Sequence, residues 1–309
     1  MLLARKDDMP DRTYDIDVTE LEYLRHGDKA YVARVYQPKG AGPFPAVIDA
    51  HGGAWVAGDR FVNEPVDRAL AARGIVVVAP EFRNPPDATY PGSVADINYA
   101  FRWLKANAAK FASRPEMVGT MGTSSGGHLV VLAALKPEDP RYAAIPCPGG
   151  GDARVPFVVA LWPVICPVTR FRMHRADPKS VGNPGAVIMQ EKYWLTEAAM
   201  EEGSVAFAVN RGDKVSTKPH ILYVQHPKDT QHPRVNLESF VAGYKKRGGQ
   251  IELHWFEGEK YDAVRSAPDS PDAKAAIDKI VAFIHERAKA HAAAPFETRA
   301  ARAPQGEAV

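Results

Sequence analysis

Short apolar runs alternate with amphipathic stretches along most of this chain. Runs with the composition of strands occupy 30–36, 44–50, 74–80, 117–121, 157–162, 220–225 and 250–256. Helical periodicity, or an apolar run of helical length, occurs at about 91–110, 129–135, 235–247 and 271–290. Several of the strand runs are almost wholly apolar, as expected where helices cover both faces of a sheet. The pattern predicts an α/β fold with a mostly parallel central sheet.

Three stretches depart from this alternation. Residues 1–29 are charged and poorly periodic beyond the first four, so we expect a loose helix or an N-terminal flap there. The strand–helix rhythm lapses over 164–216, which marks an insertion in a core formed by 30–163 and 217–290. Residues 291–309 are rich in Ala, Arg, Pro and Glu, and this composition predicts a disordered or loosely docked tail.

Composition and charge narrow the partners. The 309 residues, 45% of them hydrophobic, suffice for one large domain with a sizeable core. The 39 Lys and Arg against 37 Asp and Glu leave a net charge of +2, which indicates neither a nucleic acid nor a membrane surface as partner. We expect a small-molecule substrate, and a homodimer is compatible with the sequence. Arg5 interrupts the apolar start and no apolar run approaches the length of a membrane span, so we expect a cytoplasmic protein.

Metal and disulfide patterns do not emerge from the sequence. Its two cysteines, Cys147 and Cys166, match neither a zinc motif nor a disulfide framework. His220, His226 and His232 recur at six-residue intervals, unlike the compact ligand spacing of zinc motifs. We therefore expect no metal site and no cofactor.

The stretch Gly122-Thr123-Ser124-Ser125-Gly126 stands between a strand-like run and a helix-like run. A G-x-S-x-G turn in this setting holds the serine in a strained conformation, with its hydroxyl exposed above a parallel sheet. Such a cluster in isolation is often a loop or a helix N-cap. The flanking strand and helix favour the catalytic interpretation, in which Ser124 is the nucleophile.

A second motif, His51-Gly52-Gly53-Ala54-Trp55, follows the buried strand at 44–50. Two consecutive glycines there expose backbone N–H groups, which an oxyanion hole requires. We expect Gly52 and Gly53 to be its donors, together with the N–H of Ser125. A lone Gly-Gly is usually only a turn, but this one precedes the serine motif by about 70 residues, in the order that α/β-hydrolases use.

With both motifs, the chain resembles an α/β-hydrolase of the hormone-sensitive-lipase-like esterase family, in the branch whose serine motif reads G-T-S-x-G. The resemblance covers about 30–285 and includes Phe82-Arg83-Asn84-Pro85-Pro86, Tyr90-Pro91, Asp96 and Trp103. It implies a carboxylic-ester hydrolase with helices on both faces of the sheet and a helical cap formed by the insertion at 164–216. In that family the residue matched by His51 is structural.

The resemblance also implies a Ser–His–Asp triad, and here the chain departs from the family. Asp229 lies just past the strand at 220–225, where the family carries the acid that orients the base. Where the family has its catalytic histidine, this chain has Tyr261, followed by Asp262. A phenol with a reference pKa near 10 is protonated at neutral pH and donates rather than accepts a proton. By alignment alone, the triad lacks its base.

Three explanations remain open at this point. His226 and His232 bracket Asp229, and either could serve as an alternative base if the loop folds toward Ser124. Alternatively, Tyr261 could shuttle a proton in a lyase, cyclase or isomerase. The third is a catalytically impaired binding protein, or a variant substituted on purpose. Ester hydrolysis by a serine nucleophile leads, because the serine motif and the oxyanion glycines occur together.

The cap region adds candidate substrate contacts. Trp55, Tyr193 and Trp194 are candidates for the pocket wall, although Tyr193 and Trp194 suit the core of the cap equally well. Three arginines are candidates for recognising a carboxylate, although a solvated cap surface explains them more simply; they are Arg170, Arg172 and Arg175.

Overall fold

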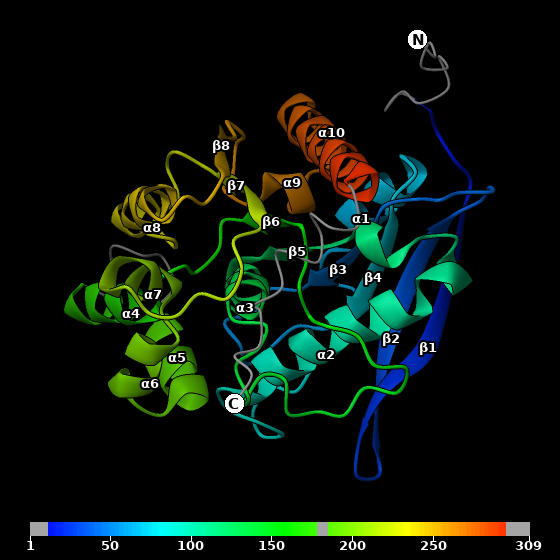
Figure 1. Ribbon diagram of the computed structural model, residues 1–309. Helices are drawn as coiled ribbons and strands as arrows, with labels where there is room; N and C mark the ends of the chain where they lie inside the picture. Colours follow the sequence, from blue (N-terminus) through cyan, green and yellow to red (C-terminus); the bar gives the residue numbers. More distant parts are fainter. Residues whose placement is uncertain (1–11, 178–184, 295–309) are drawn as a thin grey trace.

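The computed structural model describes residues 12–177 and 185–294, and its centre is one eight-stranded sheet (Figure 1). The strands are β1 (Ile16–His26), β2 (Lys29–Pro38), β3 (Ala46–Ala50), β4 (Val76–Pro80), β5 (Val118–Thr123), β6 (Phe157–Leu161), β7 (His220–Gln225) and β8 (Ile251–Trp255). Their order across the sheet is β1-β2-β4-β3-β5-β6-β7-β8. The pairs from β4 to β8 are parallel, and β2 pairs antiparallel with both β1 and β4. The predicted mostly parallel sheet is confirmed.

The prediction of a loose helix or flap over 1–29 is wrong for Ile16–His26, and its part at 1–11 lies outside the described residues. Ile16–His26 is a strand that runs along the edge of the sheet, antiparallel to β2. Its charged residues face outward, and Glu20 forms ion pairs with Arg34 and Arg60. These charged residues interrupt the apolar run that indicates a strand covered on both faces. They are tolerated because one face of this edge strand is exposed to solvent.

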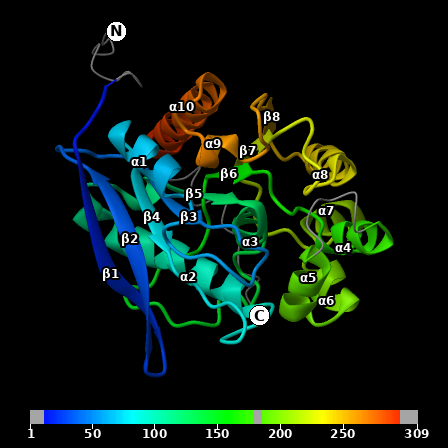
Figure 2. The ribbon, with the colours of Figure 1, turned by 180° about the vertical axis from the view of Figure 1, so that it is seen from behind.

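Helices cover both faces of the sheet, as Figure 2 shows from behind. Apolar side chains of α2 (Gly92–Asn107), α3 (Ser124–Leu135) and α8 (Arg234–Lys246) pack in the core on one face. Those of α1 (Glu64–Ala72), α9 (Ala263–Ser266) and α10 (Pro271–Ala293) pack on the other. Two short 3₁₀ helices span Ala108–Phe111 and Pro115–Met117. Helix α10 runs three residues beyond its predicted end, and the expected tail from 295 onward lies outside the described residues.

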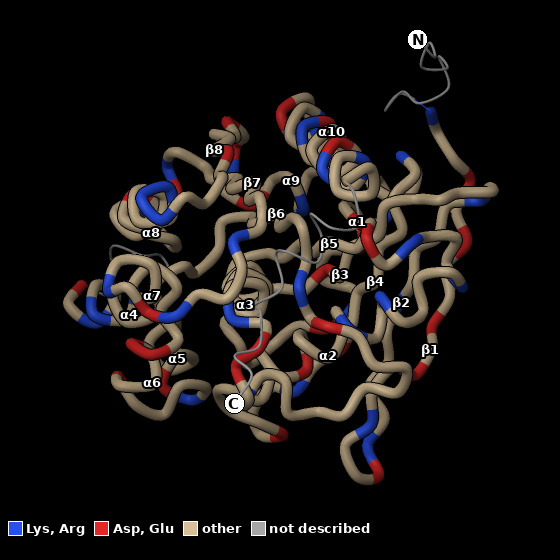
Figure 3. The backbone as a smooth tube through the Cα atoms, in the orientation of Figure 1, with Lys and Arg blue, Asp and Glu red and all other residues tan. Residues whose placement is uncertain are grey.

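The described helices of the insertion expected to form a cap lie together at one end of the molecule (Figures 1 and 2). They are α4 (Pro167–Ala176), α5 (Ala186–Trp194), α6 (Glu197–Glu202) and α7 (Val205–Arg211). Figure 3, a backbone tube coloured by residue type, shows Lys and Arg positions interspersed with Asp and Glu positions in both core and cap. Within 12–177 and 185–294, none of the helices is both long and apolar enough to cross a bilayer.

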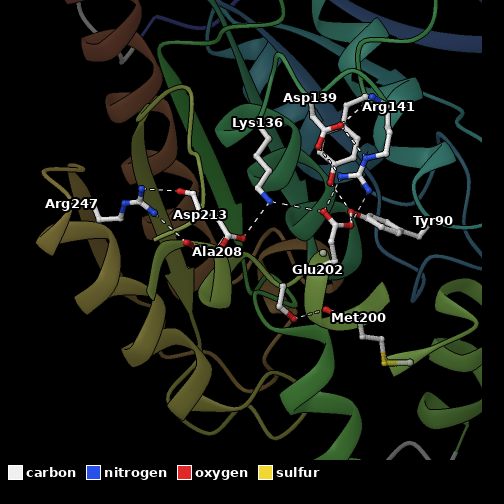
Figure 4. Close-up of polar contacts among 12 residues, drawn as sticks. Tyr90, Lys136, Asp139, Arg141, Met200, Glu202, Ala208, Asp213 and Arg247 are labelled. Carbon is white, nitrogen blue, oxygen red and sulfur yellow. Dashed lines mark hydrogen bonds and ion pairs between the residues drawn. The ribbon is translucent and has the colours of Figure 1, made fainter. Parts of the chain in front are cut away.

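The cap is joined to the core by a charged network (Figure 4). Glu202 at the end of α6 accepts hydrogen bonds from the hydroxyl of Tyr90 and from the Arg141 guanidinium, with Arg141 Nη2 at 2.8 Å. Lys136, just after α3, lies 4.0 Å from Glu202 and 3.7 Å from Asp213. This network fixes the cap beside the helix that begins at Ser124.

Candidate active site

Ser124 occupies the sharp turn from β5 into α3, with φ of 51°. This left-handed conformation is rare for a residue with a side chain, and it points the hydroxyl away from the sheet. Gly126 permits the turn, because a Cβ there would lie 2.1 Å from the carbonyl oxygen of Ala50 at the end of β3. Ser124 remains partly exposed while the residues around it are buried.

His232 is the base-type side chain that the structure brings to Ser124. The Oγ of Ser124 lies 2.9 Å from Nε2 of His232, and Nδ1 of His232 lies 2.7 Å from Oδ2 of Asp229. Since the Asp229 carboxylate accepts a hydrogen bond from Nδ1–H, Nε2 of a neutral imidazole is free to accept the serine proton. The three side chains thus have the connectivity of a serine-hydrolase triad.

Asp229 also organises the loop that carries His232. Its Oδ1 accepts the backbone N–H groups of Gln231 and His232, at 2.8 and 3.1 Å, and its Oδ2 accepts Nε2–H of Gln225 at 2.9 Å. Burial opposes ionisation, but the His232 ring and the two backbone donors outweigh it, so the pKa of Asp229 lies below its usual value. The carboxylate is therefore ionised at neutral pH.

His226 and Tyr261 take other positions. The ring of His226 accepts the backbone N–H of Lys228 at Nδ1, 3.0 Å away, and its Nε2–H donates to the carbonyl of Gly258 at 2.9 Å. Both of its nitrogens thus serve to connect the loops after β7 and β8. The Tyr261 ring packs against the ring of His232, with 5.6 Å between centroids. The structure therefore places His232, and neither His226 nor Tyr261, at hydrogen-bonding distance from Ser124.

The oxyanion glycines differ from expectation in one respect. The N–H of Gly52 donates to Oγ1 of Thr123 at 3.0 Å, so it is occupied within the protein and the prediction for Gly52 needs correction. Gly53 has φ of 130°, and a Cβ there would lie 1.9 Å from the carbonyl oxygen of Ala57. Among the described residues no acceptor is found for the Gly53 N–H. Gly53, together with Ser125 in the first turn of α3, remains a candidate donor.

The three aromatic candidates form a closed cluster instead of an open pocket wall. Trp55, Tyr193 and Trp194 are each at most 1% exposed. Trp55 stacks on Tyr193 at 5.6 Å and meets Trp194 edge-on at 5.4 Å. Their large apolar surfaces join the loop after β3, which carries Gly52 and Gly53, to α5 of the cap. Tyr193 and Trp194 therefore belong to the core of the cap, the second of the two roles considered for them.

His128 of α3 packs against this cluster, with its ring edge-on to Trp55 and Trp194. The indole N–H of Trp55 donates to Nδ1 of His128 at 3.2 Å. Because Nδ1 of His128 is an acceptor, the proton of the neutral ring is on Nε2 of His128, which donates to the carbonyl of Gly203 at 2.8 Å. Burial lowers the pKa of His128 to about 4, which keeps the ring neutral. The serine helix, the oxyanion loop and the cap therefore meet at one neutral imidazole.

The three cap arginines have separate environments. Arg172 and Arg175 are exposed and form ion pairs with Glu197, and Arg172 also pairs with Glu201. Arg170 is 4% exposed, and its Nε–H donates to the carbonyl of Gln231 at 2.8 Å. The simpler surface explanation holds for Arg172 and Arg175, whereas Arg170 contacts the loop that carries His232.

Several residues of the site escaped the sequence analysis. Four of them form hydrogen bonds to residues that are distant in the sequence or across a turn; they are Thr123, Gln225, His128 and Gln190. Local sequence carried no signal for them. His232 was already one of the two candidate bases. The spacing Asp-x-x-His in a loop after a buried strand could have favoured it over His226, because one carboxylate can then bind both the loop backbone and the imidazole.

Two curated relatives of this chain are esterases. Esterase LipC of Mycobacterium tuberculosis is 37% identical over 238 residues, a match that covers 75% of this chain and 57% of LipC. Versiconal hemiacetal acetate esterase of Dothistroma septosporum is 34% identical over 142 residues, or 45% of this chain and 42% of that protein. The chain thus matches less than two thirds of the length of these curated relatives.

Solved structures share the fold. A hyperthermophilic esterase from the archaeon Pyrobaculum calidifontis has a TM-score of 0.71 at 22% identity, covering 89% of this chain and 87% of that one. Carboxyl esterase 2 of the fungus Tuber melanosporum has a TM-score of 0.73 at 18% identity, covering 90% and 89%. The predicted α/β-hydrolase fold is confirmed.

A family model described as BD-FAE matches residues 34–206. The matched segment is more than half of the chain and contains the oxyanion loop, the serine turn and most of the cap. The protein therefore belongs to the BD-FAE family.

Proposed function

We propose that this protein is a carboxylic-ester hydrolase whose triad is Ser124, His232 and Asp229. The observation that carries the proposal is the 2.9 Å contact between Oγ of Ser124 and Nε2 of His232. The esterase relatives support the reaction class. The substrate is a small ester, and the catalytic steps described next need no cofactor.

The mechanism follows from the donors and acceptors. Nε2 of His232 takes the proton from Ser124 as Oγ attacks the ester carbonyl, and Asp229 stabilises the imidazolium that forms. The N–H groups of Gly53 and Ser125 stabilise the negative charge on the carbonyl oxygen. His232 then gives its proton to the departing alkoxide, leaving an acyl group on Ser124. Water, deprotonated by His232, attacks this acyl-enzyme, and the acid leaves as His232 returns the proton to Oγ of Ser124.

Tyr261 occupies, in this proposal, the place where related esterases have their histidine. Its ring packs against His232 and lies edge-on to Trp162 at 6.2 Å. Burial, with Asp262 and Asp229 nearby, raises the pKa of Tyr261, so its phenol stays neutral near pH 7. The alternative of a lyase, cyclase or isomerase, and that of a binding protein, depended on the absence of a base beside Ser124. In the proposed triad His232 is that base, so ester hydrolysis is the simpler function.

The experiment pairs covalent labelling with turnover. The protein is treated with a fluorophosphonate and, separately, assayed with p-nitrophenyl acetate and butyrate, beside Ser124→Ala. We expect one adduct on the peptide that contains Ser124, ester hydrolysis by the parent, and loss of both in the variant. A folded parent that neither reacts with the phosphonate nor hydrolyses any ester of the panel would refute the proposal.

A further inference from the structure

The cap contributes one buried cation to the loop of the catalytic base. Arg170 lies on α4, and its Nε–H donates to the carbonyl oxygen of Gln231 at 2.8 Å. Its Nη1–H donates to Oε1 of Gln190 on α5, also at 2.8 Å. The amide of Gln190 in turn donates to the carbonyl of Pro167, at the start of α4, at 3.0 Å. The guanidinium is thus held by the cap and directed at the loop after β7.

The Gln231–His232 peptide unit is hydrogen-bonded at both its carbonyl oxygen and its N–H group. Arg170 binds its carbonyl oxygen, and Oδ1 of Asp229 binds its N–H at 3.1 Å. This peptide immediately precedes the Cα of His232, so its orientation sets the direction of the imidazole. A displacement of about 1 Å at a reacting group can cost on the order of 10²-fold in rate. Restraint of this peptide therefore bears directly on the Ser124–His232 contact.

The charge of Arg170 suits this place. Burial lowers the pKa of Arg170 to about 10, and Asp229 and Tyr261 oppose that effect. The side chain is therefore protonated at neutral pH, and its charge is balanced by the ionised Asp229. A buried cation without such a partner would be costly.

We propose that Arg170 is a positioning residue for the catalytic base: the cap, through this side chain, holds His232 in reach of Ser124. The inference rests on the proposed triad. It assigns the cap a part in catalysis beyond enclosing the substrate. Because Arg170 acts through His232 and not on the ester, its removal should lower kcat and leave KM nearly unchanged.

The test compares Arg170→Met with Arg172→Met. Arg172 lies on the same helix, but it is exposed and pairs with Glu197 and Glu201, so it is a matched control. With p-nitrophenyl butyrate we expect kcat to fall about 10- to 100-fold for Arg170→Met. For Arg172→Met we expect a change of less than about 2-fold, as for other surface ion pairs. An increase in KM at constant kcat would overturn the proposal in favour of direct substrate binding.

The second arm shows whether Arg170 acts through His232. The rate of Ser124 phosphonylation is measured for His232→Ala and for the double variant with Arg170→Met. Equal rates support the proposal, because the arginine has no base left to position. A further loss similar to that in the parent background would overturn it. If His232→Ala alone reacts and turns over like the parent, the triad itself is wrong, which separates the two failures.

A third arm guards against loss of folding. Arg170→Lys keeps the charge and one donor, and Gln190→Leu leaves the arginine but removes the amide that orients it. We expect both to retain the thermal unfolding transition and to give kcat values between those of the parent and Arg170→Met. Parent-like kcat in both folded variants would contradict the positioning role.

Discussion

The loops after β7 and β8 leave the same edge of the sheet, because the two strands pair in parallel through Gln225 and Trp255. The loop after β7 carries Asp229 and His232 in a hydrogen-bonded turn. The loop after β8 carries Tyr261, which is held by contacts with the rings of Trp162 and His232. One loop thus presents a proton acceptor to Ser124, and the other presents a packing surface to that acceptor.

The comparison shows what constrains a catalytic base. Neighbouring strands are about 4.8 Å apart. The loops after β7 and β8, which lie two and three strands from β5, can therefore both extend toward Ser124. The proton transfer requires an imidazole about 3 Å from Ser124 with a carboxylate behind it, whichever loop supplies it. For His232 this carboxylate is Asp229, three residues earlier in the same loop. A base at the position of Tyr261 would have to reach Asp229 from a different loop.

The largest expected effect is that of His232→Ala, which removes the acceptor. We expect kcat/KM for p-nitrophenyl butyrate to fall by about 10⁴-fold, the upper end of general-base assistance, since both acylation and deacylation use this group. His226→Ala is the control in the same loop, and its hydrogen bonds to Gly258 and Lys228 lie outside the triad. It should stay within about 5-fold of the parent. A greater loss for His226→Ala than for His232→Ala would reverse the assignment of the base.

Asp229→Asn should rank second, with a loss of up to about 10⁴-fold in kcat/KM. The amide keeps the size of the side chain but loses the negative charge and favours the wrong imidazole tautomer. Asp262→Asn provides the control on the other loop, because Asp262 pairs with Arg265 and Ser266 in α9. It should lose less than about 3-fold. Similar losses in both carboxylates would show that the two loops share the acid role.

Moving the histidine from one loop to the other tests the comparison itself. In His232→Gln, we expect the added change Tyr261→His to recover about 10- to 100-fold of the lost kcat/KM if the loop after β8 can still present a base. Ser124→Ala in the same background controls for hydrolysis by the new imidazole alone. No recovery in a folded double variant would show that the geometry of that loop no longer permits catalysis.

Tyr261→Phe should have the smallest effect, less than about 3-fold in kcat/KM, because the ring that packs on His232 is retained. Since burial and the nearby carboxylates raise the pKa of Tyr261 above the usual value for a tyrosine, the phenol loses its proton only at higher pH. The kcat/KM profiles of parent and variant from pH 7 to 10 should therefore be parallel. A limb near pH 10 that disappears in the phenylalanine variant would assign the tyrosine a catalytic proton.

The elements that depend on local pattern could be predicted. The seven strand-like runs became β2 to β8, and Ser124 stands in a turn whose glycines are required by close backbone contacts. These features follow from short-range sterics and from apolar runs covered on both faces. The edge strand β1 could not be predicted in the same way, because Glu20 and its charged neighbours face solvent beside Arg34 and Arg60.

The amino-acid pattern and the family resemblance were enough to predict the α/β-hydrolase fold, the position of Ser124 and two candidate histidines for the base. The choice of His232 over His226 in our proposal required the folded chain, because the direction of a loop depends on partners distant in the sequence. Arg170 of the cap holds the carbonyl of Gln231, while Gly258 holds the ring of His226 away from the serine. The same reason explains Gly52, whose N–H is directed by Thr123, 71 residues away in sequence. A hydrogen bond between distant segments costs chain entropy that only the whole packed core can offset, so local pattern does not encode it.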